Sequence, residues 1–132
     1  MPLWTFRDYL DAGGTNVIRQ WMDSDEVPLE AAVKIDARIL FLADLRVWPP
    51  QYVSAITGWP DLLELRVVYA GNHYRPLGFC DPGHEFTIVH AVVEKRKLPR
   101  HVLMTATDRM NIVRSDRRRS CAHEFRTKPT AG

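Results

Sequence analysis

The sequence has few cysteines and no long apolar run, and these absences exclude several classes of protein. Cys80 and Cys121 are the only cysteines among 132 residues, too few for the disulfide framework of a small secreted domain. No CxxC pair occurs, which argues against a zinc site. No stretch of 18 apolar residues indicates a membrane-spanning helix, and the N-terminus lacks the basic start and apolar stretch of a secretory signal. We therefore expect a cytoplasmic protein without a membrane partner.

The formal net charge of +2 hides an uneven distribution along the chain. Residues 1–65 contain five Lys or Arg against ten Asp or Glu, whereas residues 66–132 contain thirteen against six. A basic half of this kind is typical of proteins that bind a polyanion such as a nucleic acid. Charge alone does not distinguish such a protein from one with a solvated basic tail.

The N-terminal half predicts a short strand followed by two helices. Residues 3–9 alternate weakly between apolar and polar, as in a strand, and Thr15 is placed to cap a short helix over 16–22. A longer helix is expected from 29 to about 45, after Pro28, because its apolar residues recur at helical spacing. Pro49–Pro50 ends this helix, and residues 51–61 are interpreted as a connector.

Beyond residue 62 the apolar period changes from that of a helix to that of a strand. The pattern predicts an antiparallel meander of three strands with short turns, over residues 63–70, 74–80 and 85–93. Pro76 places the second strand at a sheet edge or a bulge, since proline cannot donate to a ladder. Pro99 then opens a C-terminal helix that reaches about Arg114.

This order of elements predicts an α+β fold, with the helices segregated from an antiparallel sheet. One domain is expected over residues 1–114. Residues 115–132 contain Arg117–Arg119 and little apolar content, so we expect them to form a flexible basic tail.

Four short features occur in a fixed order in the second half of the sequence. They are Glu-Leu-Arg at 64–66, Tyr-Arg at 74–75, the apolar strand at 85–93, and Glu-Lys-Arg-Lys at 94–97 before the helix opened by Pro99. In this order and at these gaps they resemble the RelE/ParE toxin superfamily, and most of all its phage-derived HigB-like branch. The resemblance covers roughly residues 3–112, and its specific part is 62–106.

The resemblance implies the toxin of a type II toxin–antitoxin system, an mRNA endoribonuclease that acts on the ribosome. Its implied partners are mRNA, the ribosome and a cognate antitoxin, here expected to be a helix-turn-helix protein encoded by a neighbouring gene. The implied reaction is attack of a 2′-hydroxyl on the adjacent phosphate, which leaves a 2′,3′-cyclic phosphate and a free 5′-hydroxyl. It needs a base, an acid and cationic groups, but no metal or cofactor.

The same resemblance assigns roles to basic residues within and after the strands. Arg75 is expected to bind the scissile phosphate through its planar guanidinium, and Lys95 or Arg96 to stabilise the developing charge. The remaining RNA-binding candidates, with the tyrosines stacking on bases, are Arg66, Tyr69, Tyr74, Lys97 and Arg100. An alternative stays open, in which Arg75 pairs with Glu64 or Glu85 and the tyrosines pack within the sheet.

The acid and the base are harder to assign. Many relatives carry a tyrosine or histidine in the last helix or tail, whereas this chain has no tyrosine after Tyr74. His101, six residues beyond Lys95, is the best substitute, and His90 in the third strand and His73 in the hairpin are the others. Histidine suits the role because its pKa lies near the working pH.

Two other functions remain open at this stage. A ParE-like toxin of the same fold would bind DNA gyrase and cut no RNA, and a phage or mobile-element protein of the same fold would act only by binding. The basic cluster Lys95–Lys97, together with Arg75, favours the nuclease, since a gyrase binder needs no cationic active site.

Overall fold

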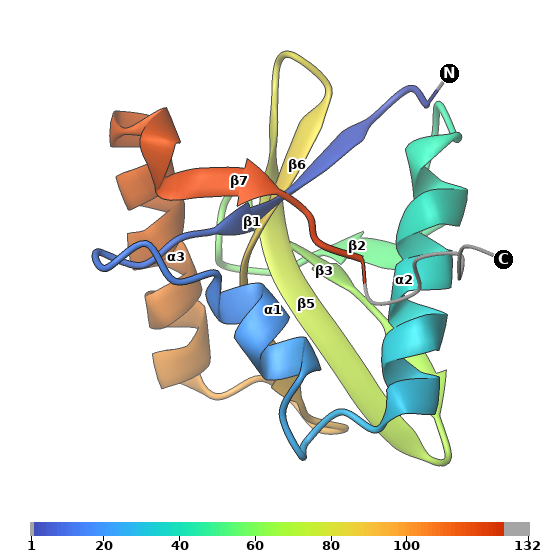
Figure 1. Cartoon of the computed structure of the whole chain (residues 1–132). Helices are drawn as coiled ribbons and strands as arrows, with labels where there is room; N and C mark the ends of the chain where they lie inside the picture. Colours follow the sequence, from blue (N-terminus) through green and yellow to red (C-terminus); the bar gives the residue numbers. More distant parts are fainter. Residues whose placement is uncertain (1, 126–132) are drawn as a thin grey trace, which may run out of the picture.

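The structure, a computed structural model, describes residues 2–125 and has the α+β architecture expected from the sequence (Figure 1). Within these residues the chain forms three α-helices and a seven-stranded sheet. The helices are α1 (Val17–Met22), α2 (Leu29–Ala43) and α3 (Arg100–Ser115), and a short 3-10 helix, η1 (Arg117–Arg119), follows α3. The strands are β1 (Thr5–Tyr9), β2 (Val53–Ala55), β3 (Leu63–Leu65), β4 (Val67–Tyr69), β5 (Asn72–Asp81), β6 (Glu85–Val93) and β7 (Ser120–Ala122).

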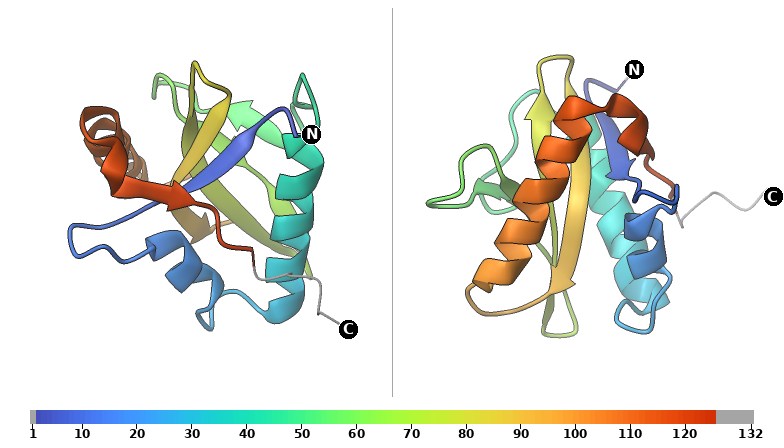
Figure 2. Two further views of the ribbon diagram at one scale, coloured as in Figure 1. Left: turned by 45° about the horizontal axis from the view of Figure 1, so that its top comes forward. Right: turned by 90° about the vertical axis from the view of Figure 1, so that its left-hand side faces the viewer.

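The sheet separates two helical layers. Its strands lie in the order β2-β3-β5-β6-β1-β7, and β4 also pairs with β5. Paired strands are antiparallel except β1 and β6, which are parallel. Helices α1 and α2 pack on one face and α3 on the other, so that α3 and α2 lie on opposite sides of the sheet (Figures 1 and 2).

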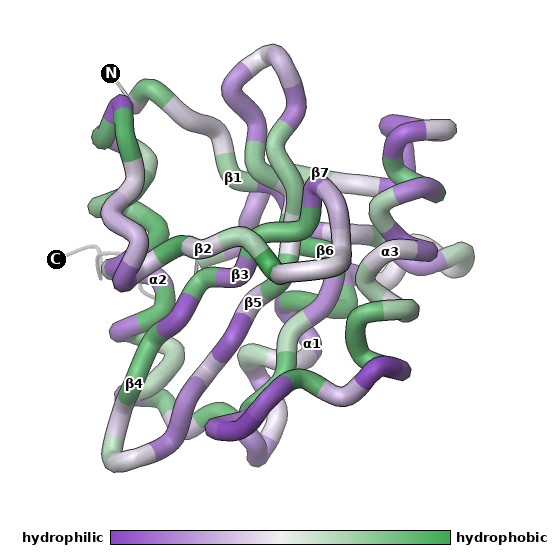
Figure 3. The backbone as a smooth tube through the Cα atoms, turned by 180° about the vertical axis from the view of Figure 1, so that it is seen from behind, coloured by the Kyte–Doolittle hydropathy of each residue, from purple (hydrophilic) through white to green (hydrophobic). Residues whose placement is uncertain are grey.

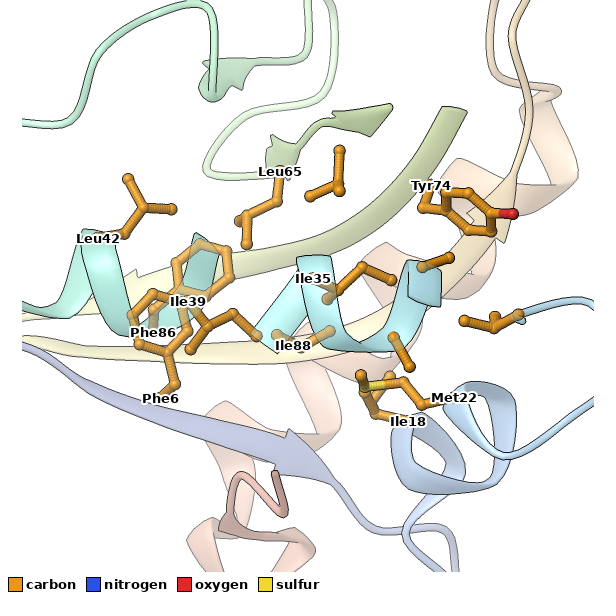
Figure 4. Close-up of a cluster of buried hydrophobic side chains, with 14 of the residues drawn as sticks. Phe6, Ile18, Met22, Ile35, Ile39, Leu42, Leu65, Tyr74, Phe86 and Ile88 are labelled. Atoms are coloured by element: carbon orange, nitrogen blue, oxygen red, sulfur yellow. The ribbon is translucent and has the colours of Figure 1, made fainter. Parts of the chain in front are cut away.

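An apolar core lies on each face of the sheet. On the α2 face, Ile35, Ile39 and Leu42, each at most 1% exposed, lie in one cluster with Phe86 and Ile88 of β6 (Figure 4). These α2 positions are spaced four and three residues apart, which places them on one side of the helix. On the other face, the buried residues of α3 pack over β5 and β6; they are Val102, Leu103, Ala106, Met110 and Val113. The two cores fix β5 and β6, and with them the turn that leads into α3.

The helices begin and end close to the predicted positions. Both α2 and α3 start directly after a proline, Pro28 and Pro99, as the sequence predicts. The predicted cap of α1 is wrong, because Asn16 rather than Thr15 occupies the cap position and its side-chain oxygen accepts hydrogen bonds from two backbone N–H groups of the first turn. No helix within residues 2–125 is both long enough and apolar enough to cross a membrane.

The predicted meander is present, but its first strand is divided at Arg66 into β3 and β4. Both segments pair with β5, and the interruption falls opposite Arg75 and Pro76 in the register. Pro76 has no N–H to donate, which fits the loss of pairing at this point. However, β5 has β3 and β4 on one side and β6 on the other, so the edge position predicted for Pro76 is wrong. The connector at 51–61 also contains the unpredicted strand β2.

A change of register between β5 and β6 lies next to Pro76. It falls between Leu77 and Gly78, in agreement with the predicted alternative of a bulge at this place. A side chain at Gly78 would collide with the carbonyl oxygen of Thr87 and the ring of Phe86. Glycine is therefore needed where the two central strands approach each other.

The C-terminal segment belongs to the sheet. Strand β7 pairs antiparallel with β1, with Tyr9 opposite Ser120 and Arg7 opposite Ala122. The backbone N–H of His123 also donates to the carbonyl oxygen of Phe6 at 3.0 Å. The flexible tail predicted from residue 115 therefore does not hold for residues 117–123, and residues 126–132 of that tail lie outside the described part of the chain.

Candidate functional site

The connection between β6 and α3 gathers basic side chains of the predicted site. Lys95, Arg96, Lys97 and Arg100 are all exposed, and Figure 3 shows this connection as a strongly hydrophilic stretch leading into α3. Pro99 begins the helix without a side-chain cap, so the first N–H groups of α3 add the partial positive charge of the helix dipole. We call residues 94–100 the basic turn, and its composition suits it to bind phosphate groups.

Arg75 holds the basic turn in place from inside the fold. Its side chain is only 7% exposed. Its Nε donates to Glu64 Oε2 at 2.6 Å, and its Nη1 donates to the carbonyl oxygens of Glu94 at 3.1 Å and Arg96 at 2.6 Å. With these protein acceptors in place, the guanidinium is not free for the two-oxygen grip on phosphate that the sequence led us to expect. The alternative pairing with Glu64 is the one observed, in a buried rather than a surface setting.

Glu64 is a site residue that sequence reasoning treated only as a possible partner of Arg75. Its Oε1 accepts a hydrogen bond from Arg66 Nη2 at 3.0 Å, so the carboxylate lies between two arginines. The Glu64 side chain is 8% exposed, whereas that of Arg66 is 44% exposed and reaches solvent. The motif Glu-Leu-Arg could have indicated this contact, because residues two apart on a strand point to the same face of a sheet. Glu64 and Arg66 have that spacing.

A pocket of about 330 Å³ opens between β3 and the start of α3. Its lining includes Ile56, Thr57, Trp59, Glu64, Lys97 and Leu103. The Arg100 guanidinium carbon lies 5.7 Å from the centroid of the Trp59 ring. This hollow, the Trp59 pocket, therefore joins apolar and aromatic walls to one carboxylate and one ammonium group of the basic turn.

A second hollow of about 590 Å³ brings together the two histidines singled out from the sequence. His90 of β6 and His101 of α3 both line it, with Arg109 of α3 and Trp21 and Glu26 from the α1 side. We call it the histidine groove. His101 is exposed on the first turn of α3 and so borders the basic turn as well.

His90 is a neutral imidazole of defined tautomer. Burial, together with the nearby charges of Arg109 and His101, lowers the pKa of His90 to about 4. Arg109 Nη1 lies 3.3 Å from His90 Nδ1, and since arginine only donates, Nδ1 must be the nitrogen without a proton. The proton of His90 therefore sits on Nε2, so that His90 is suited to donate a hydrogen bond, and the exposed His101 is the better group for proton transfer.

The two tyrosines of the predicted RNA-binding set lie differently from expectation. Tyr74 is 1% exposed and belongs to the core on the α2 face (Figure 4). A buried ring has no face on which a base can stack, so Tyr74 leaves the RNA-binding set. Tyr69 is half-buried and packs against the same core.

A buried charge cluster, which the sequence did not indicate, joins three separate segments of the chain. His123 lies between two aspartates, with Nδ1 2.7 Å from Asp8 Oδ1 and Nε2 2.8 Å from Asp36 Oδ1. Burial acts to lower the pKa of His123, but the hydrogen bonds to Asp36 and Asp8 outweigh it and raise the pKa to about 9. The imidazolium thus joins β1 and α2 to the C-terminal segment, which was expected to be a flexible tail.

Comparison with known families places the basic turn within a recognised unit. The family model for the phage derived protein Gp49-like (DUF891) matches residues 22–111, more than half of the chain. The chain belongs to this phage-derived family. The family is related to RelE/HigB-type toxins, and the matched span includes the central strands β3–β6, the basic turn and most of α3. No curated protein sequence gives a significant match to the chain.

Proposed function

We propose that this protein is the toxin of a type II toxin–antitoxin pair and cleaves mRNA, on the ribosome, by metal-independent attack of a 2′-hydroxyl. One observation carries the proposal: the start of α3 joins the exposed cations of the basic turn to His101, an exposed acid–base group. Phosphate binding and proton transfer are thereby available at one place. Membership in a phage-derived family related to toxins supports the same function.

In the proposed reaction, the basic turn binds the phosphate and His101 transfers the protons. Lys95, Arg96 and the first N–H groups of α3 bind the scissile phosphate and stabilise its added charge. His101 takes the proton of the 2′-hydroxyl as the 2′-oxygen bonds to phosphorus. The resulting imidazolium returns a proton to the 5′-oxygen as the phosphorus–5′-oxygen bond breaks. His90, held neutral beside Arg109, offers its Nε2–H as a hydrogen-bond donor to the bound RNA.

The other site residues hold this arrangement and the RNA. Arg75 fixes the basic turn through the carbonyl oxygens of Glu94 and Arg96, so we assign it a positioning role. Arg66, Lys97 and Arg100 are exposed beside it and suit contacts to the RNA backbone. Binding should therefore weaken steeply as salt is raised, since each phosphate contact releases counterions.

The proposal includes a cognate antitoxin, a helix-turn-helix protein encoded by a neighbouring gene. We expect an acidic segment of it to cover the basic turn, because opposite charges steer and align such contacts. The covered residues would then be those that bind phosphate, which explains inhibition without any change in the fold of the toxin.

Primer extension on cellular mRNA after induction of the protein alone tests the proposal. We expect discrete cuts inside translated codons, with cyclic phosphate ends, and their loss in Lys95→Ala and His101→Ala. The matched control is Arg118→Ala, because the Arg118 side chain is exposed and lies outside the site. Intact mRNA with broken or relaxed DNA would instead favour gyrase binding. If both mRNA and DNA stay intact, the remaining hypothesis is a protein of this fold that acts only by binding.

A reconstitution separates ribosome dependence from cleavage itself. Purified protein is mixed with one mRNA, either free or on translating ribosomes, and the ends of the fragments are identified. Cleavage only on ribosomes supports the full proposal, whereas cleavage of free mRNA removes ribosome dependence. Fragments with 3′-hydroxyl and 5′-phosphate ends, the products of attack by water, contradict attack by the 2′-hydroxyl.

A further inference from the structure

We propose that the Trp59 pocket is a base-recognition subsite, and that the base it selects is guanine. The inference rests on the proposed function only in taking RNA as the ligand. It concerns a cavity that lies beside the basic turn and that the proposed cleavage chemistry does not use.

The pocket has the size and walls expected of a site for one nucleobase. Its volume is about 330 Å³, and Ile56, Trp59 and Leu103 give it apolar and aromatic surface. Proteins that bind single-stranded RNA take up splayed bases against aromatic side chains and contact their Watson–Crick edges. Lys97 lines the same pocket and belongs to the basic turn, so a base in the pocket would lie next to a bound phosphate.

Glu64 supplies the chemistry that selects among bases. Each of its carboxylate oxygens accepts one hydrogen bond from an arginine, Arg66 Nη2 at Oε1 and Arg75 Nε at Oε2. A carboxylate has about four acceptor positions, so two remain for a ligand. A base that presents two adjacent donors therefore fits, whereas one that presents an acceptor at the same place is repelled.

Guanine is the RNA base with that pattern. Its N1–H and N2–H groups point the same way and can both donate to Glu64, and its O6 accepts, as the ammonium of Lys97 requires. Adenine and cytosine present an unprotonated ring nitrogen in this position. Uracil presents a single N–H between two carbonyl oxygens.

Arg75 links this subsite to the phosphate site. The same guanidinium holds Glu64 and the carbonyl oxygens of the basic turn, with Glu64 and Arg75 both buried. The carboxylate is thus fixed before a ligand arrives, and the spacing between base and phosphate is set by one side chain. A fixed spacing would select which nucleotide lies beside the cut.

Binding of single nucleotides to the unaltered protein tests the inference without any cleavage. Calorimetry with the 3′-monophosphates of guanosine, adenosine, cytidine and uridine should show guanosine binding at least about tenfold tighter than the other three. Inosine 3′-monophosphate lacks only the N2 amino group and should bind more weakly than guanosine. Equal binding of inosine and guanosine, or adenosine binding as tightly as guanosine, would overturn the assignment.

Two variants locate the effect in the pocket. Glu64→Gln should remove the preference for guanosine, and Trp59→Ala should weaken the binding of every nucleotide. Glu30→Gln, at an exposed carboxylate of α2, is the matched control and should change neither. If Glu64→Gln fails to fold, the comparison of inosine with guanosine on the unaltered protein still decides.

The inference and the proposed function fail separately. Guanosine preference in a protein that leaves mRNA intact would contradict the nuclease and keep the subsite. Cleavage by a protein that binds all four nucleotides equally would contradict the subsite and keep the nuclease.

Discussion

Asp8 and His123 lie 115 positions apart in the sequence, yet His123 Nδ1 is 2.7 Å from Asp8 Oδ1 and both side chains are buried. The other ring nitrogen of His123 lies 2.8 Å from Asp36 Oδ1. One imidazolium therefore separates two carboxylates that would otherwise repel each other in the interior. Removing it leaves two charges that burial makes costly.

His123→Ala should therefore destabilise the protein strongly, by about 3–5 kcal/mol, because it leaves buried charges without their partner. Urea denaturation followed by tryptophan fluorescence measures the loss. Arg118→Ala, at a side chain that is 90% exposed, should stay within about 0.5 kcal/mol of the parent protein. An unchanged urea midpoint for His123→Ala would show that the bridge contributes nothing to stability.

Stability should fall as the pH rises from about 6.5 to 9. The pKa of His123 is raised to about 9 in the folded protein, above its value near 6.5 in an unfolded chain. Below pH 6.5 both states carry the proton and the bridge contributes fully; above it the unfolded state loses the proton first.

Melting temperatures between pH 6.5 and 8.5 check this slope. Burial also raises the pKa of Cys80, to about 11. This shift too lowers stability as the pH rises, but only near and above the ordinary pKa of a thiol. His123 lies against the carboxylates of Asp8 and Asp36, and its neighbour Cys121 lies near Asp8, Glu124 and Arg7. A melting temperature that rises over this window would contradict a protonated His123.

Arg75 and Arg66 share Glu64 but should respond differently to substitution. Arg75→Gln leaves the buried Glu64 carboxylate without its closest partner and frees the basic turn, so we expect a loss of about 3–5 kcal/mol. Arg66→Gln removes a contact of a half-exposed side chain and should cost less than about 1 kcal/mol. Urea denaturation of the two variants gives the comparison. Equal stability of both would mean that Arg75 does not hold the turn.

His90 should stay neutral down to about pH 4, with its proton on Nε2. Nitrogen chemical shifts of the histidine rings report both properties. Arg109→Gln should raise the pKa of His90 toward its ordinary value, because one nearby positive charge is lost while burial remains. Arg114→Gln, elsewhere on α3, should leave it unchanged. Titration of His90 near pH 6.5 in the parent protein would contradict the lowered pKa, and a proton on Nδ1 of the neutral ring would rule out the assigned tautomer.

Local signals in the sequence predicted much of the fold. Strand β6 has the predicted bounds, and α3 ends one residue from the predicted position, because β-branched runs and prolines act over a few neighbouring residues. Strand β7 escaped prediction, since three residues of weak pattern become a strand only through pairing with β1. Thr15 and Asn16 are both good cap residues, and only the local geometry selects Asn16.

The sequence predicted many of the residues at the candidate site, but not the part that each of them plays in the structure. The sequence located the basic turn, and the structure brings His90 and His101 into one groove. The sequence did not show that Arg75 is buried. Alternation along a strand tells which face of the sheet a residue lies on, but not what covers that face. His123 was invisible to local reasoning, since its partners lie in β1 and α2.

The pairing of β7 with β1 also sets an order of events during synthesis. Strand β1 is made first, but its second neighbour in the sheet and the counterion of Asp8 come from residues 120–123. A nascent chain therefore keeps an open edge on β1, and Asp8 lacks its contact with His123, until residues 120–123 have left the exit tunnel. Chains that stop before residue 120 would lack this closure, so we expect them to fold less stably than chains that contain β7 and His123.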